Sequence, residues 1–323
     1  MKSKIAALAI LCLLFNTALL AQKPDTLIHK LDSLSKKKDS AGKQINNTNP
    51  SAYNEKTKFT FPSYFILLGS DLKQAFTKPF HMSSKDWKLF GGFLLVEGAV
   101  AFLDEPIQRQ ATKVMNQNSG FKGVSTYVTD FGGTYEVYTL ASLGAYGFLF
   151  KNEKMQTTTL LATQAYITGG AIESVLKFLS GRQRPNYYDR NTLEAEPKFH
   201  GPFARTGTDI NGNRLNSSFP SGHTTVAFAA ATVFAKEYHD RPWVPILAYS
   251  AATLIGVSRI TENKHWATDV LAGAAIGYLT GNLVVNNYHR YAKLRAPKQK
   301  KNTVSFNLNY SMGHLMPGLV YRF

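Results

Sequence analysis

Three short segments of the chain combine basic side chains, imidazoles and a Ser-Gly pair at places where helices are expected to begin or end. The segments are Lys177-x6-Arg184-Pro185, Pro220-Ser221-Gly222-His223 and Ser258-Arg259-x5-His265-x3-Asp269. Enzymes that transfer phosphoryl groups depend mainly on positive charges and amide donors placed around the phosphate oxygens. The three segments therefore predict one site that holds a phosphate group and transfers it.

The cations and the helix start suit the binding of phosphate oxygens. An arginine such as Arg184 or Arg259 can bind two oxygens of a phosphate at once, whereas Lys177 acts as a point charge. Ser221 and Gly222 open a predicted helix, whose unpaired backbone N–H groups and dipole favour an anion. Glycine also lets the backbone come close to a ligand. We therefore predict that these five residues bind the phosphate.

The imidazoles suit the chemical steps of the transfer. His265 and Asp269 are four residues apart, so they share a helix face. Asp269 can accept a hydrogen bond from one imidazole nitrogen, which leaves the other nitrogen free to attack phosphorus. His223 comes from a different helix and can donate a proton to the leaving oxygen. We therefore predict catalytic roles for His265, Asp269 and His223.

Apolar stretches bounded by polar residues, Gly or Pro are expected to form the helices that position these segments. Four of them cover residues 156–180, 223–236, 243–260 and 266–286. Consecutive helices joined by short connections usually run antiparallel. The first and third helices then end, and the second and fourth begin, at the same end of a bundle. Alternation alone predicts that the three segments meet there.

The predicted fold is all-α, a helical bundle of about six core helices with the active site at one end. Two further apolar stretches, residues 87–102 and 137–150, complete the six. Near the C-terminus, apolar and polar residues alternate over 304–310 and 319–323, with turn residues at Gly313 and Pro317-Gly318. This alternation predicts a short C-terminal β-hairpin in addition to the bundle.

The three segments resemble the sequence pattern of the phosphatidic acid phosphatase type 2 / vanadium haloperoxidase superfamily. That superfamily includes bacterial class A acid phosphatases, lipid phosphate phosphatases and vanadate-dependent haloperoxidases. Every defining position of the pattern is present, in order and at the family's spacings. The resemblance implies that His265 is a nucleophile forming a phosphohistidine, that Asp269 orients it and that His223 is the general acid. It also implies that the phosphatase branch needs no metal, and that the phosphate oxygens are held by Lys177, Arg184, Ser221, Gly222 and Arg259.

Other interpretations stay open at this point. Each segment alone is more often an ordinary feature: an Arg-Pro helix stop, a Ser-Gly helix cap or a surface His–Asp pair. Their joint occurrence on one face favours the catalytic interpretation. One alternative function is a vanadate-dependent haloperoxidase, with vanadate as its cofactor and His265 as the covalent ligand. Another is a non-enzymatic envelope protein that binds through its tail and hairpin.

Length and composition predict one main domain with tails in a chain of 323 residues. Residues 1–21 are typical of a signal peptide, with an uncleaved anchor helix as the alternative. Residues 22–60 are expected to be a flexible polar lead-in, 61–290 the helical domain, and 291–323 a basic linker and hairpin tail. The only cysteine, Cys12, lies in the signal peptide, so a cleaved chain has no disulfide and no thiolate nucleophile.

The net charge of +16 includes basic runs at residues 36–38 and 290–301, outside the apolar helices. No nucleic-acid recognition module accompanies them, so nucleic acid is not an expected partner. A solvated linker or an anionic membrane surface is expected instead. The signal peptide predicts export to the bacterial periplasm or cell envelope, and the mean hydropathy of −0.18 is low for a protein with six membrane spans. We expect a periplasmic bundle able to associate with the membrane, with an integral inner-membrane protein as the alternative.

The expected function is metal-independent hydrolysis of phosphomonoester or pyrophosphate bonds. A lipid phosphate is the expected substrate, and a small soluble phosphomonoester is the alternative. The polar loop over residues 186–218 follows the first segment on the active-site face and is long enough to serve as a lid. The remaining histidines are expected to be solvated; they are His29, His81, His200, His239, His289 and His314.

Overall fold

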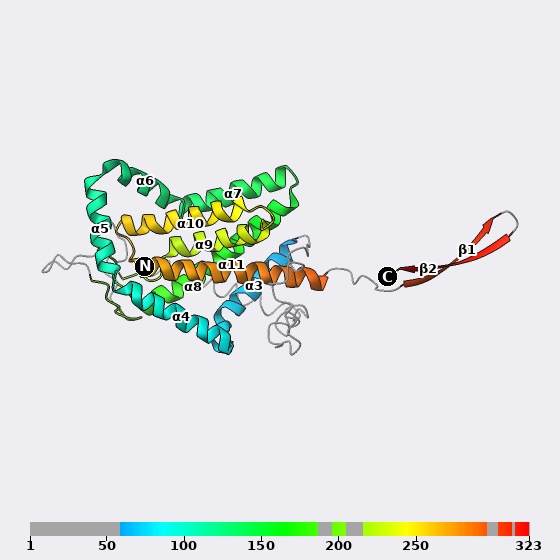
Figure 1. Ribbon diagram of the computed structural model, residues 1–323, viewed down its shortest axis with the longest axis horizontal. Coiled ribbons are helices and arrows are strands. Elements are labelled where there is room, and N and C mark those ends of the chain that lie inside the picture. The colour runs from blue at the N-terminus through cyan, green and yellow to red at the C-terminus, as the bar shows by residue number, and fades with distance from the viewer. Residues whose placement is uncertain (1–58, 187–195, 205–215, 296–302, 312–313, 323) are drawn as a thin grey trace, which may run out of the picture.

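The computed structural model describes residues 59–186, 196–204, 216–295, 303–311 and 314–322. The predicted signal peptide with Cys12, almost all of the predicted lead-in and the larger part of the predicted lid loop lie outside these residues. Within the described residues, the chain folds as a bundle of helices followed by a two-stranded hairpin (Figure 1).

The predicted all-α bundle is confirmed. The six helices that the apolar stretches predict are all present, and α3, α5 and α6 are additional α-helices in the described part of the chain. The helices are α3 (Phe61–Thr77), the short 3-10 helix η2 (Lys78–His81), α4 (Ser84–Ala101), α5 (Asp104–Gln117), α6 (Ser119–Asp130), α7 (Thr134–Leu149), α8 (Glu153–Ser180), α9 (Gly222–Glu237), α10 (Trp243–Thr261) and α11 (Ala267–Arg295).

The end of α8 is fixed by a glycine cap. Gly181 has a φ of +51°, in the left-handed region that glycine adopts without strain, and its N–H donates to the carbonyl oxygen of Lys177. A Cβ at this position would also collide with the backbone of Gly201. Because the helix ends here, Arg182 and Arg184 leave α8 at the end of the bundle.

Helices α9 and α11 make the most extensive helix–helix contact in the described part of the chain. Gly273, Gly277 and Gly281 are spaced four apart on α11 and face α9. A Cβ on Gly273 would lie 2.7 Å from the carbonyl oxygen of Ser221, and a Cβ on Gly281 would lie 2.6 Å from that of Ala229. The backbones of the two helices are therefore in direct contact, and the start of α9 lies beside the start of α11.

The additional helices α5 and α6 pack at the end of the bundle where α10 ends, and Figure 1 shows α5 crossing that end. Gln108 of α5 donates from Nε2 to Oδ1 of Asn263, just after α10, at 2.9 Å. Thr129 of α6 donates to Oγ of Ser258, within α10, at 2.7 Å. These contacts place α5 and α6 over the region of the third sequence segment.

Large apolar side chains remain exposed on the outside of the bundle. Among them are Leu95 of α4, Leu149 of α7 and Ile246 of α10. The helical segments Trp243–Thr261 and Ala267–Ala292 are also long and apolar enough to cross a membrane, by length and composition. Exposed apolar surfaces of this extent mark membrane or protein contacts. These features fit association with a membrane.

The predicted C-terminal hairpin is also present. Strands β1 (Thr303–Ser311) and β2 (His314–Arg322) pair in antiparallel register. Pro317 and Gly318, expected to form a turn, instead lie inside β2, opposite Leu308 and Asn307. Proline within sheets is confined largely to edge strands, and both strands of a two-stranded sheet are edge strands.

Among the histidines whose side chains the structure describes, one departs from the expectation of solvation, and His29 lies outside the described residues. His289 is buried, and its Nε2 lies 2.7 Å from Oε1 of Glu237 at the end of α9. The expectation was wrong because α11 continues to Arg295, beyond residue 286, so His289 lies within a packed helix and not in a linker.

Candidate active site

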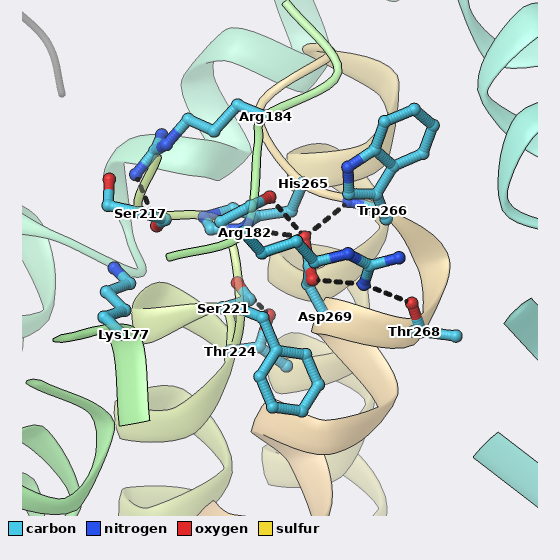
Figure 2. A network of polar contacts seen from close by, with 12 residues as sticks. Lys177, Arg182, Arg184, Ser217, Ser221, Thr224, His265, Trp266, Thr268 and Asp269 are labelled. Atoms are coloured by element: carbon cyan, nitrogen blue, oxygen red, sulfur yellow. Dashed lines mark hydrogen bonds and ion pairs between the residues drawn. The ribbon is translucent and has the colours of Figure 1, made fainter. Parts of the chain in front are cut away.

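The three sequence segments lie together at the end of the bundle where α8 and α10 end and α9 and α11 begin (Figure 2). The N–H of Ser221 donates to the carbonyl oxygen of Asp269 at 2.9 Å, which joins the start of α9 to that of α11. A Cβ placed on Gly222 would lie 3.4 Å from Nζ of Lys177, so the last turn of α8 meets the start of α9. The helix ends thus bring the segments into contact.

The three cations reach this site from different elements. Lys177 lies in the last turn of α8 and Arg259 in the last turn of α10, whereas Arg184 follows α8. Nη2 of Arg184 donates to the carbonyl oxygen of Ser217 at 3.3 Å, as Figure 2 shows. Arg259 is buried, and its Nε makes no hydrogen bond within the described part of the chain. Three positive charges therefore converge on one small region.

An acid that the sequence reasoning did not assign also belongs to this region. Glu173 lies one turn before Lys177 on α8, and its Oε1 forms an ion pair with Nζ of Lys177. The same oxygen is so close to Gly222 that an added Cβ would lie 2.5 Å from it. The buried carboxylate of Glu173 therefore offsets the positive charge of Lys177 beside the start of α9.

The ring of His223 is covered by the turn between α6 and α7. A Cβ on Gly133 would lie 3.0 Å from Nε2 of this histidine, and one on Gly132 would lie 3.1 Å from its Cβ. Burial, together with the nearby charges of Arg259, Lys177 and Arg184, lowers the pKa of His223 to about 3. The imidazole is therefore neutral near neutral pH when no anion is bound.

Binding of a phosphate-like oxyanion should return a proton to His223. The negative charges of the oxyanion offset the three cations, so the pKa of the imidazole should rise from its value of about 3. At a pH between the old and new pKa values, binding should then take up one proton. Histidine ring NMR shifts, followed against pH with and without vanadate, measure this, and His223→Gln assigns the signal. A ring that already titrates near pH 6.5 without oxyanion would contradict the prediction.

His265 and Asp269 lie on one side of the start of α11, as their spacing predicts, but they are not in tight contact. Nδ1 of His265 is 3.5 Å from Oδ2 of Asp269 and makes no hydrogen bond among the described residues. That oxygen accepts instead from the N–H of Trp266, at 2.8 Å, and from the hydroxyl of Ser218. Such distances often shorten when substrate binds, so the spacing leaves room for an orienting role.

Burial also lowers the pKa of His265 well below its usual range. The charges of Arg184, Lys177 and Arg259 and the neighbouring His223 act in the same direction. The ring is therefore neutral, which is the protonation state that a nucleophilic nitrogen needs.

Sequence reasoning missed the residues that hold Asp269 from behind. The other carboxylate oxygen, Oδ1, accepts from Nη1 of Arg182 at 2.6 Å, and the same nitrogen donates to the hydroxyl oxygen of Thr268 (Figure 2). The second terminal nitrogen of Arg182, Nη2, donates to Asp104. One signal was available for Arg182, since it lies inside the first segment, two residues before Arg184. Asp104 carries no comparable signal, because it begins a helix that no apolar pattern predicted.

Comparison with known proteins identifies this part of the chain. Residues 158–293 match the PAP2 superfamily. The chain is 34% identical over 168 residues to the lipid A 1-phosphatase of Porphyromonas gingivalis, covering 50% of this chain and 32% of that protein. It is 29% identical over 169 residues to lipid phosphate phosphatase 1 of Arabidopsis thaliana, covering 45% of this chain and 52% of that protein.

Among solved structures, the first transmembrane PAP2 type phosphatidylglycerolphosphate phosphatase from Bacillus subtilis aligns with a TM-score of 0.44 at 21% identity. The alignment covers 66% of this chain and 98% of that one. The chain spans between a third and about half of the length of these two curated relatives. Residues 158–293 hold all three segments, so the part of the chain that matches the PAP2 superfamily is the part in which the segments predicted that resemblance.

Proposed function

We propose that this protein is a metal-independent phosphatase that hydrolyses phosphomonoester or pyrophosphate bonds of lipid phosphates in the cell envelope through a phosphohistidine. The observation that carries the proposal is the meeting of two imidazoles, the buried His265 and the partly buried His223, with three cations at one end of the bundle. The names of the relatives, lipid A 1-phosphatase and lipid phosphate phosphatase 1, support phosphorylated lipid as the substrate class.

In the first step, the phosphate docks against Lys177, Arg184, Arg259 and the amides at the start of α9. Because Nδ1 of His265 faces Asp269, Nε2 is the nitrogen left to attack phosphorus. The new N–P bond forms as the bond from phosphorus to the leaving oxygen breaks, and His223 gives its proton to that oxygen. Asp269 stabilises the positive charge that develops on the ring of His265.

In the second step, water attacks the phosphohistidine. His223, now neutral, accepts a proton from the water, and the oxygen of the water forms a bond to phosphorus as the N–P bond breaks. His265 returns to its neutral form and phosphate leaves. Low pKa values of both rings suit this cycle, since His265 starts neutral and His223 gains its proton only when an anion is bound.

The apolar outer surface supports a lipid substrate and a location at a membrane. A protein that binds a membrane by α4, α7 or α10 meets its substrate at the bilayer surface. Export to the periplasm follows only from the predicted signal peptide, and remains part of the proposal.

The proposal is tested by phosphate release from the purified chain in the presence of a metal chelator. The two substrates are a soluble aryl phosphate and a long-chain lipid phosphate or pyrophosphate, with a His265→Ala preparation to correct for contaminants. We expect release from the lipid in chelator. Loss of activity on chelation would contradict metal independence, and release from the soluble ester alone would contradict the lipid substrate. No release from either would contradict the phosphatase itself and call for an assay of peroxide-dependent halide oxidation with vanadate.

A further inference from the structure

We infer that Arg182 and Asp104 are positioning residues that hold Asp269 charged and in place behind His265; this inference rests on the proposed function. Both side chains are almost fully buried, Arg182 at 3% exposure and Asp104 at 0%. Nη1 of Arg182 donates to Oδ1 of Asp269 at 2.6 Å, and Nη2 donates to Oδ2 of Asp104 at 2.7 Å. One guanidinium therefore links two buried carboxylates.

Thr268 closes this network and ties it to α11. Its N–H donates to Oδ1 of Asp104 at 3.0 Å, and its hydroxyl donates to Oδ2 at 2.6 Å. The hydroxyl oxygen also accepts from Nη1 of Arg182 at 2.6 Å. The carboxylate of Asp104, at the start of α5, thereby accepts a hydrogen bond from an N–H in the first turn of α11 that has no partner within the helix. The helix dipole favours a negative charge at this position.

The guanidinium is further held by aromatic rings. Its central carbon lies 4.7 Å from the centre of the Phe199 ring and 5.8 Å from that of the Trp266 ring. The indole N–H of Trp266 is itself fixed by donation to the carbonyl oxygen of Gln183 at 2.8 Å. Arg182 is thus restrained by rings as well as by charges, which is the arrangement expected of a side chain that sets the place of another.

Arg182 differs from the phosphate-binding cations in the group it acts on. Both terminal nitrogens are bound to Asp269, Thr268 and Asp104, and the cations that lower the pKa values of both histidines are Lys177, Arg184 and Arg259. Arg182 instead opposes the rise in the pKa of Asp269 that burial causes. Its effect on the reaction therefore passes through this carboxylate.

A stabilising role alone is a weak explanation for such a network. Removing ions from water is costly, and a buried ion pair often stabilises a fold no better than apolar side chains of similar size. When both carboxylates are ionised, they and the guanidinium together carry a net charge of −1 next to His265. That charge is the one needed to stabilise the imidazolium formed during attack.

Other charged groups near Asp269 are accounted for. Lys177 from α8, His265 and Glu97 from α4 also interact with it electrostatically. Glu97 makes no hydrogen bond among the described residues and adds negative charge when ionised. Among the charged groups that the structure describes near Asp269, only Arg182 supplies both a short hydrogen bond and a positive charge to the carboxylate of Asp269.

The test compares Arg182→Gln, Asp104→Asn and the double variant. In Arg182→Gln, Asp269 loses its cation and should take up a proton at higher pH, so the acid limb of the kcat profile should move to higher pH. In Asp104→Asn, the positive charge of Arg182 is offset by Asp269 alone, so the pKa of Asp269 should not rise. The acid limb of the kcat profile should therefore stay in place or move to lower pH. In both, kcat should fall about 10- to 100-fold with KM within about threefold of the original. If the pair acts as a unit, the double variant should be no worse than Arg182→Gln.

The matched control lies on the same helix. Glu105 and Arg109 form an exposed pair on α5, with Nη2 of Arg109 3.4 Å from Oε2 of Glu105. Glu105→Gln and Arg109→Gln should leave kcat and its pH profile unchanged. Equal losses of kcat in Arg182→Gln, Asp104→Asn and the double variant, with the pH profile of Arg182→Gln unmoved, would overturn the inference and indicate a purely structural role.

A second measurement does not require turnover. Relative to the original protein, Arg182→Gln should gain infrared absorption of a protonated carboxyl near neutral pH, and this gain should disappear when Asp269→Asn is added. Absence of that band would overturn the inference whether or not the protein releases phosphate. A band that appears in a protein with no phosphatase activity would instead support the positioning of Asp269 and contradict only the proposed function.

Discussion

Replacing His265 with Ala should reduce phosphate release by at least about 10³-fold, the largest effect expected of any single change. The reaction proposed above has no second nucleophile, since the other imidazole, His223, serves as acid and base. The fold should survive, because Nδ1 of His265 makes no hydrogen bond among the described residues and its removal leaves no partner there unsatisfied. The three cations should still bind an oxyanion, so KM should change less than kcat.

Trapping of the intermediate gives the sharper measurement. Substrate labelled in its phosphate, quenched during turnover, should leave an acid-labile and base-stable label on the original chain and none on His265→Ala. His81→Ala is the control, because His81 is exposed and lies in η2, outside the three segments, with Nδ1 3.0 Å from the carbonyl oxygen of Thr77. Label or turnover that persists in His265→Ala would exclude this residue as the nucleophile.

The main helices could be predicted because each is a long apolar stretch bounded by polar residues, Gly or Pro. The meeting of the three segments followed from the alternation of helix direction, which holds even across the long connection between α8 and α9. The end of α8 was also foreseeable, since Gly181 follows the last apolar turn and suits a left-handed cap. These features depend on residues that are close together in the sequence.

The residues behind the site could not be predicted for the opposite reason. Asp104 and Glu105 are adjacent acids in the first turn of α5, with nothing in the sequence to separate them. Tertiary packing buries Asp104 completely against α11 and leaves Glu105 exposed. The distance between His265 and Asp269 is likewise set by the donors Ser218 and Trp266, of which Ser218 lies in a loop. Such contacts depend on where separate elements meet.

Replacing Gly277 with Ala should impair both stability and catalysis, although the residue lies far along α11 from the site. An added Cβ would lie 2.8 Å from Cβ of Phe228 and 2.9 Å from the backbone nitrogen of Ala229, and closer still to the carbonyl oxygen of Thr225. Backbone atoms of α9 cannot rotate away, so the two helices must separate. Overpacking of this kind costs about 1–3 kcal/mol of unfolding free energy.

The effect should extend to turnover because α9 and α11 carry opposite halves of the site. Ser221, Gly222 and His223 belong to the start of α9, and Asp269 to the start of α11, so a separation near 1 Å should lower kcat about 10²-fold. Thermal unfolding in detergent and phosphate release together measure the two effects. Gly170→Ala is the matched control: nothing lies within 4 Å of its added Cβ, and alanine within helix α8 should stabilise it by up to about 1 kcal/mol. A Gly277→Ala protein as stable and active as the original would show that the site does not depend on direct backbone contact between α9 and α11.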